Sequence, residues 1–167
     1  MNEWSQCWAI PGVDCNEKDH LAFSSHSLAM MLAMQREPVD LLHYYDARMT
    51  SACTGGLFNS ETRKPTNTYF AFHMFNSLYK LGNEVETISD TNAVYALAAT
   101  NGKRSSLVLS NPAATSAEVE LSLSGVEAAD AEVFRLDHTY RYTPTGETVK
   151  GNRFVLPPYG CAELRFY

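Results

Sequence analysis

Residues 65–82, PTNTYFAFHMFNSLYKLG, mark the place where one sequence pattern ends and another begins. Pro65 suits the first position of a helix, because the amide proton it lacks would have no partner there. Phe72, Phe75 and Tyr79 recur at the spacing of one helical face and are expected to be buried. Gly82 is a suitable C-cap. The stretch therefore predicts a helix that ends at Gly82.

The residues before this helix predict alternating helix and strand. Residues 19–38, DHLAFSSHSLAMMLAMQREP, indicate a helix with Asp19 as its N-cap and Pro38 as its stop. Val39 to Asp46 is short and largely apolar, which is typical of a buried strand whose polar end emerges at one edge. Strand and helix in alternation favour an α/β layer.

The residues after Gly82 predict an antiparallel sheet. Short runs alternate apolar and polar residues, and Asn101-Gly102 between two such runs is a strong hairpin signal. About six strands at roughly ten-residue spacing favour a β-sandwich. We expect an α+β chain of two domains, residues 1–84 and 85–167. Two strands and two helices do not close an α/β layer alone, because parallel strands need neighbours on both sides. The first domain therefore resembles the last part of a larger α/β domain.

Composition and charge narrow the classes of partner. The chain has 167 residues, of which 45% are hydrophobic and 19% charged, and its formal net charge is −6. This composition supports a packed core. No run of Lys or Arg occurs, so we expect neither nucleic acid nor an anionic membrane as a partner. We also expect no transmembrane helix and no signal peptide. Localisation stays open.

No motif for a metal or a cofactor is apparent. The cysteines are Cys7, Cys15, Cys53 and Cys161, which form no C-x-x-C pair. They suit small buried hydrophobes, although a Cys7–Cys15 disulfide is an alternative. The five histidines fit no metal-binding spacing, and no phosphate-binding glycine loop is present.

Three short motifs together resemble a known group of enzymes. They are Gly55-Gly56-Leu57, Lys64-Pro65, and Tyr69 with Ala71-Phe72. Their order and spacing are similar to the C-terminal end of clan A retaining glycoside hydrolases, most of all family 39, the β-xylosidase group, and less so the family 51 arabinofuranosidases. The resemblance covers residues 1 to about 115.

The resemblance implies the last strand–helix units of a (β/α)8 barrel, followed by an antiparallel β-sandwich. Leu21 to Arg36 would be the seventh helix, Val39 to Asp46 the eighth strand, and Pro65 to Leu81 the eighth helix. The opening residues "NEWS" would then lie at the end of the seventh strand, where this group places its nucleophile.

That placement implies a set of site residues. Glu3 matches the nucleophilic glutamate, and a solvated N-terminal carboxylate is the alternative. Trp4 and Trp8 would stack on sugar rings, or pack in the core instead. Tyr44, Tyr45 and Asp46 would face the substrate at the catalytic end of a barrel strand. Arg48 would orient a carboxylate or a sugar hydroxyl, or lie free on the surface.

The implied function is hydrolysis of O-glycosyl bonds in xyloside- or arabinoside-like plant polysaccharides. Retaining glycosidases need two carboxyl groups, and this group carries its acid/base in an Asn-Glu pair on strand four. Asn16-Glu17 falls in a loop and Asn83-Glu84 at the domain junction, so neither pair replaces it. We therefore expect no activity from the chain alone. The alternatives are a non-catalytic β-sandwich that contacts carbohydrate or docks to a domain, and association with an upstream barrel segment or with a second copy.

Overall fold

The computed structural model describes residues 4, 10–14, 17, 19–49, 55–90 and 93–167. It contains two helices, α1 (Leu21–Met34) and α2 (Asn67–Leu81), and a one-turn 3-10 helix at Ala128–Asp130. The strands are β1 (Asn83–Val85), β2 (Tyr95–Thr100), β3 (Ser105–Ser110), β4 (Ala117–Glu120), β5 (Glu132–Leu136), β6 (Arg141–Pro144), β7 (Arg153–Leu156) and β8 (Cys161–Phe166).

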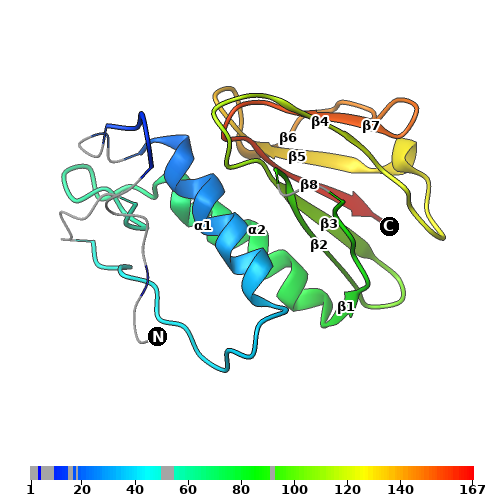
Figure 1. The fold of residues 1–167 in the computed structure, drawn as a ribbon, viewed down its shortest axis with the longest axis horizontal. Helices are drawn as coiled ribbons and strands as arrows, with labels where there is room; N and C mark the ends of the chain where they lie inside the picture. Colours follow the sequence, from blue (N-terminus) through cyan, green and yellow to red (C-terminus); the bar gives the residue numbers. More distant parts are fainter. Residues whose placement is uncertain (1–3, 5–9, 15–16, 18, 50–54, 91–92) are drawn as a thin grey trace.

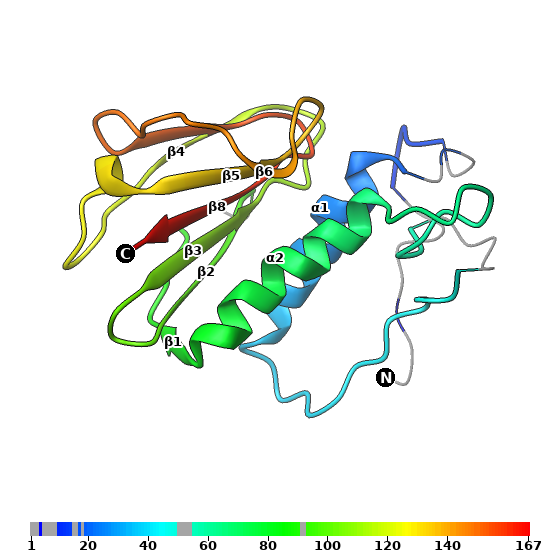
Figure 2. The same cartoon turned by 180° about the vertical axis from the view of Figure 1, so that it is seen from behind.

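The strands form two antiparallel sheets. The larger sheet has six strands in the order β1-β2-β3-β8-β5-β6, and the smaller sheet pairs β4 with β7. The helices cover one face of the large sheet, and the small sheet lies over the other (Figures 1 and 2). The α+β class and the antiparallel sheet predicted from the sequence are therefore confirmed.

The hairpin predicted at Asn101-Gly102 joins β2 to β3. Thr100 pairs with Ser105, so four residues form the loop. The Asn101 side-chain oxygen accepts hydrogen bonds from the backbone amides of Lys103 (3.0 Å) and Arg104 (2.9 Å). Gly102 has a φ of +82°, a conformation that glycine adopts without strain. Side-chain capping by Asn101 thus explains why this dipeptide closes the hairpin.

Helix α1 begins one residue later than expected. Its N-cap is His20, whose Nδ1 accepts a hydrogen bond from the Ala22 amide at 3.0 Å, so the prediction of Asp19 as N-cap is wrong. Asp19 instead accepts hydrogen bonds from the Asn67 amide and from Arg141 at the start of β6. The helix ends at Met34, four residues before Pro38. Asp19 does not cap α1 because its carboxylate is bonded to the start of α2 and to Arg141 of the large sheet.

Helix α2 buries a different stripe from the one predicted. Its N-cap is Thr66, so Pro65 precedes the cap and is not the first helical residue. The buried residues are Thr68, Ala71, Met74 and Leu78. Phe72 and Phe75 are half-buried, but Tyr79 is 79% exposed, so the prediction that it is buried is wrong. Ala71, Met74 and Leu78 pack in the core shared by the helices and the large sheet, whereas Tyr79 lies outside that core.

The buried strand predicted over Val39–Asp46 is wrong. Apart from a single bridge residue, the segment has no regular secondary structure, and Val39 and Leu41 are 41% and 69% exposed. A strand needs a hydrogen-bonded neighbour along its length. Among the described residues, Trp4 provides the one such contact, an isolated parallel bridge to Tyr44. The expected alternation of strand and helix is therefore two helices with irregular segments around them.

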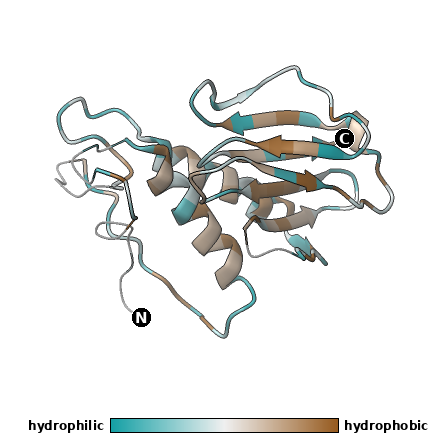
Figure 3. Cartoon of the chain, turned by 45° about the horizontal axis from the view of Figure 1, so that its top comes forward, coloured by the Kyte–Doolittle hydropathy of each residue, from teal (hydrophilic) through white to brown (hydrophobic). Residues whose placement is uncertain are grey.

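Two apolar cores lie on the two faces of the large sheet. One holds Leu28, Met74 and Val108 between the helices and the sheet. The other holds Leu109, Leu156 and Leu164 between the two sheets. Figure 3 shows apolar residues along both helices and the central strands. Strand β1 crosses the division expected at residue 84 and pairs with β2. That division stays a prediction.

Candidate active site

Trp4 joins the segment that follows α1. The Trp4 amide donates a hydrogen bond to the carbonyl oxygen of His43 at 3.0 Å, and the Tyr45 amide donates one to the carbonyl oxygen of Trp4 at 2.8 Å. These bonds form the parallel bridge between Trp4 and Tyr44. The resemblance implied that Trp4 and Tyr44 lie on neighbouring segments, and the structure brings them side by side.

An aromatic cluster surrounds this bridge. The Trp4 and Tyr44 ring centroids lie 4.8 Å apart, edge to face, and Tyr44 and Phe72 lie 4.7 Å apart in a similar arrangement. Trp4 is stacked on Phe72 at 6.3 Å and is only 8% exposed. The indole of Trp4 therefore packs in the core here, which was the alternative to stacking on a sugar ring. Aromatic pairs in this geometry hold the bridge against α2.

The Tyr44 hydroxyl is held in place rather than free to react. It donates a hydrogen bond to the carbonyl oxygen of Gly55, and Ser27 Oγ of α1 lies 3.4 Å away. Burial raises the pKa of Tyr44 to about 12. The phenol is thus neutral at ordinary pH, and its bond to Gly55 ties two irregular segments together.

Asp46, Arg48 and Tyr45 form a compact polar group. Asp46 is 5% exposed and accepts hydrogen bonds from Arg48 Nε at 2.9 Å and from Arg48 Nη2 at 2.7 Å. The Tyr45 hydroxyl accepts another from Arg48 at 2.7 Å. Hydrogen bonding to Asp46, with its negative charge, raises the pKa of Arg48. A two-pronged pair of this kind fixes the guanidinium geometry.

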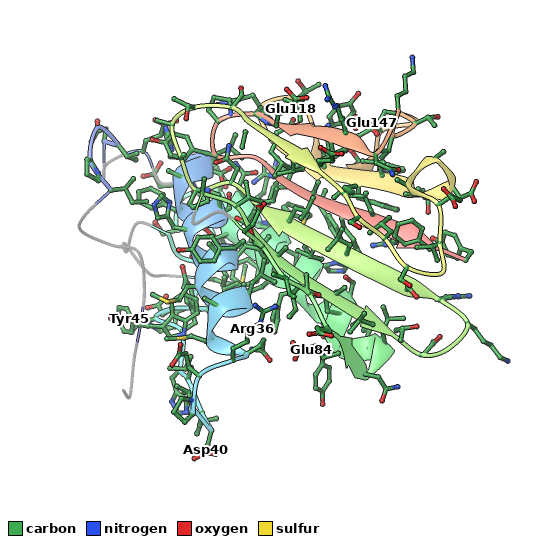
Figure 4. The ribbon with its side chains drawn as sticks, turned by 45° about the vertical axis from the view of Figure 1, so that its right-hand side comes forward. Arg36, Asp40, Tyr45, Glu84, Glu118 and Glu147 are labelled. Carbon is green, nitrogen blue, oxygen red and sulfur yellow. The ribbon has the colours of Figure 1, made fainter. Side chains whose placement is uncertain are left out.

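The group keeps one side toward solvent. The Arg48 side chain is 62% exposed, and Tyr45 is 39% exposed with the guanidinium carbon 5.3 Å from its ring centre. Figure 4 shows Tyr45 away from the sandwich, on the far side of α1 from Glu118 and Glu147. Tyr45 and Arg48 thus present a phenol and a guanidinium to solvent. The expectation that Arg48 orients a carboxylate fits its pairing with Asp46.

Two of the candidate site residues, Glu3 and Trp8, lie outside the described residues, as do Cys7, Cys15 and Cys53. The other four, Trp4, Tyr44, Tyr45 and Asp46, lie together at one end of the helix pair. Their roles in binding or catalysis stay predictions. The contacts by which Phe72 and Gly55 hold this cluster were not predicted. Both residues belong to the motifs quoted from the sequence, but those motifs do not place them against Tyr44.

A second polar cluster, centred on Glu163, was missed entirely. Glu163 lies on β8, fully buried, and its Oε1 accepts hydrogen bonds from Ser77 of α2 at 2.6 Å and from Ser106 of β3 at 2.7 Å. Its Oε2 accepts from Arg165 at 2.9 Å and from Tyr142 of β6. The signal was available, since a glutamate that alternates with Ala162 and Leu164 must point to the opposite face of a central strand.

Within the part of the chain that the structure describes, no group of three or more His, Cys, Asp or Glu side chains is arranged to hold a metal ion. None of the described helices has the length and apolarity needed to cross a bilayer.

Comparison with solved structures shows which proteins share this fold. A glycoside hydrolase family 30 subfamily 8 xylanase, Xyn30A from Clostridium acetobutylicum, aligns with 99% of the chain at a TM-score of 0.69 and 15% identity. The chain shares its fold with part of a glycoside hydrolase. A family 30 xylanase C catalytic domain from Talaromyces cellulolyticus aligns with 100% of it, at a TM-score of 0.64 and 20% identity. A family 44 xyloglucanase from Paenibacillus polymyxa aligns with 99%, at 0.60 and 15%.

The chain spans only part of these structures, namely 41% of the first, 38% of the second and 31% of the third. Scans against family models and against curated protein sequences find no match. At identities of 20% or less, the similarity establishes the fold. It does not establish an activity.

Proposed function

We propose that this chain is part of a retaining glycoside hydrolase that acts on xyloside- or arabinoside-like plant polysaccharides. The observation that carries the proposal is the alignment of 99% to 100% of the chain with xylanase structures at TM-scores of 0.69 and 0.64. The motifs Gly55-Gly56-Leu57 and Lys64-Pro65 add independent support from the sequence. The similarity to family 39 rests on the sequence motifs alone, since the solved structures reported above come from families 30 and 44. Family 39 is therefore also a proposal.

In this proposal, residues 1–84 are the last units of a (β/α)8 barrel and residues 85–167 its accessory sandwich. The parallel bridge between Trp4 and Tyr44 supports this assignment, because adjacent barrel strands are parallel. The polar group of Tyr45, Asp46 and Arg48 directly follows this bridge, and in this proposal it lies on the side of the barrel that faces substrate.

Glu3 is the proposed nucleophile. It directly precedes Trp4, whose backbone is hydrogen-bonded to the segment that carries Tyr44 to Asp46. A retaining mechanism needs a second carboxyl about 5–5.5 Å from the nucleophile to protonate the leaving oxygen. No part of the chain matches the strand that carries this acid in the group. We therefore propose that these 167 residues do not turn over substrate by themselves.

The first test is to read the coding sequence upstream of Met1 in the same frame, and to assay the resulting protein on xylan and on aryl xylosides and arabinosides. We expect hydrolysis by the extended protein and none by residues 1–167. Glu3→Gln should reduce turnover by roughly 10²-fold or more, the scale of losing a catalytic carboxyl. Glu84→Gln is a matched control, because Asn83-Glu84 is also an Asn-Glu pair and Glu84 is exposed.

A stop codon directly before Met1, or full activity of Glu3→Gln, would contradict the catalytic proposal. The alternative is then a non-catalytic module that contacts carbohydrate or docks to another domain. The two apolar cores support this second candidate, because residues of this chain form both of them. Titration of residues 1–167 with xylo-oligosaccharides would show saturable binding without hydrolysis.

A further inference from the structure

A groove runs between the two sheets on the side of β1, β2 and β4. Its volume is about 740 Å³, within the usual range for binding sites. The floor is made by β2 and β3, and the wall by β4 and the residues that follow it. The small sheet has two strands and faces a large sheet of six, so part of the large sheet's outer face is left as this groove.

Several apolar side chains that line this groove are only partly buried. Ala96 and Ala98 of β2 point toward the groove and are only half-buried, whereas Leu97 and Ala99 on the opposite face are 4% and 5% exposed. Val119 on β4 is also half-buried, and Ile88 at the rim is 81% exposed. An apolar surface of this kind outside a core is typical of a binding surface.

Strand β4 gives the groove a backbone edge. Among the described residues β4 pairs with β7 alone, so its other edge carries backbone groups with no strand beside them. An extended peptide can add to such an edge through backbone hydrogen bonds, while alternate side chains enter the pockets beside it. The groove's apolar floor lies where those alternate side chains would point.

The exposed residues at the edge of the groove, called the rim here, favour an occupant with positive charge. Of the lining residues that the structure describes, four are acidic and none is Lys or Arg; the acidic ones are Glu86, Asp90, Glu118 and Glu120, all exposed. Arg153 lies 3.6 Å from Glu118, and both side chains are more than 60% exposed, so this ion pair is weak. The rim therefore attracts cations and repels nucleic acid.

The lining also excludes two other occupants. Phe166 is the only aromatic residue among the lining residues described, and it is buried, so the groove offers no exposed ring on which a sugar can stack. A second copy added edge to edge at β4 would bring Glu118 and Glu120 close to their equivalents, and like charges directly opposite each other destabilise a strand pair.

We propose that this groove binds an extended peptide segment from outside these 167 residues, added as a strand beside β4, with apolar side chains that face the floor and Lys or Arg side chains at the rim. The segment is recognised by its backbone edge, its alternation and its charge. The proposal goes beyond glycoside hydrolysis and does not depend on it.

The test measures peptide binding to the complete 167-residue chain by fluorescence anisotropy. The probe is a labelled heptapeptide of alternating Lys and Val, and its controls are peptides of alternating Glu and Val and of alternating Lys and Ser. We expect saturable binding of the Lys-Val peptide, weakened by added salt because the rim charges are exposed. We expect at least about tenfold weaker binding of each control peptide.

Two protein variants locate the peptide. Glu118→Lys with Glu120→Lys should weaken binding at least about tenfold. Glu127→Lys with Glu132→Lys, outside the groove lining, is its matched control and should bind as the unaltered chain does. Ala98→Trp should fill the floor and weaken binding to a similar extent, whereas Ala129→Trp at an exposed position should not. Circular dichroism checks that each variant folds.

Several outcomes would overturn the proposal. They are the absence of Lys-Val peptide binding, equal binding of the Glu-Val peptide, and unchanged binding after the charge reversal at positions 118 and 120. Competition by xylo-oligosaccharides would assign the groove to carbohydrate instead. A dimer of the unaltered chain in sedimentation that Ala98→Trp abolishes would assign it to a second copy.

Discussion

Glu163 joins three elements of the molecule through one side chain. Its carboxylate accepts hydrogen bonds from Ser77 on α2, Ser106 on β3 and Tyr142 on β6, and it pairs with Arg165 on its own strand. A buried carboxylate of this kind is tolerated because its lone pairs are satisfied. The same bonds hold α2 against the large sheet.

Replacing Glu163 should therefore be costly. Glu163→Ala leaves the partly buried Arg165 without its counter-charge and should lower the free energy of unfolding by about 3–5 kcal/mol. Glu118→Ala, which removes an exposed ion pair on β4, should cost less than about 1 kcal/mol. Urea unfolding followed by circular dichroism measures both. Equal losses in the two variants would show that the buried cluster adds no stability.

The same residue predicts how stability responds to acid. Burial alone raises the pKa of Glu163, but the hydrogen bonds from Arg165, Ser77, Tyr142 and Ser106 outweigh it, so the pKa lies below its usual value. Because the folded-state pKa is lower than the unfolded value of about 4.3, this stabilisation is complete above that pH. It is lost as the pH falls through the folded-state pKa.

Urea midpoints between pH 7 and pH 3 test this expectation. The unaltered chain should lose stability below about pH 4.3 more steeply than Glu163→Gln, in which this group does not titrate. Parallel curves for the two proteins would rule out Glu163 as a source of the acid sensitivity.

At the scale of elements, Gly82 controls the passage from α2 into β1. It has a φ of +87°, and its amide hydrogen-bonds to the carbonyl oxygen of Leu78, as in a left-handed helix cap. No atom within 4 Å would obstruct an added Cβ, so the backbone conformation is the sole obstacle to a side chain. The cap fixes where the helical layer ends and the sheet begins.

Gly82→Ala should therefore destabilise the chain by about 1–2 kcal/mol, the cost of placing an L-residue in the left-handed region. Gly82→Asn should cost less, because asparagine tolerates this conformation. Thermal and urea unfolding of the two variants measure the difference. A Gly82→Ala variant as stable as the unaltered chain would show that the turn relaxes to a negative φ.

At the scale of the whole molecule, the helices and the large sheet share one core. Leu97 on β2, Val108 on β3 and Leu136 on β5 face the helices and are at most 4% exposed. Asp19 adds a polar link, since it bonds both the start of α2 and Arg141 of β6. The division at residue 84 thus separates segments that bury each other's apolar surface.

We therefore expect residues 85–167 expressed alone to aggregate or to bind the dye ANS, because the sheet face that α1 and α2 cover would be exposed. Residues 1–167 should unfold in one cooperative transition. Light scattering and dye fluorescence compare the two proteins. A soluble, dye-free fragment with a cooperative transition would show that the sandwich is an independent domain.

Local signals predicted much of this fold from the sequence. The helix ending at Gly82, the hairpin at Asn101-Gly102 and the antiparallel strands after it all follow from capping, turn chemistry and period-two alternation. The predicted strand at Val39–Asp46 failed because apolar composition alone does not supply a hydrogen-bonding partner. The N-cap moved from Asp19 to His20 because a distant arginine, Arg141, competes for that carboxylate.

For the candidate site, the sequence predicted which residues to consider but not all of the contacts between them. Tyr44 and Asp46 were selected by their place in the resemblance, and the structure brings Trp4 to Tyr44 and Arg48 to Asp46. Their partners Phe72 and Gly55, and the whole of the Glu163 cluster, come from segments far apart in the chain. A local sequence pattern does not predict contacts between residues so far apart in the chain.

The sequence by itself determined the two helices, the antiparallel sheet after Gly82 and the excess of negative charge, because these depend on neighbouring residues and on composition. The tertiary structure alone decided which helix stripe is buried, that Glu163 links α2 to three strands, and that two strands facing six leave a groove with an acidic rim. These features arise from contacts between residues distant in sequence, and only the folded chain brings those residues together.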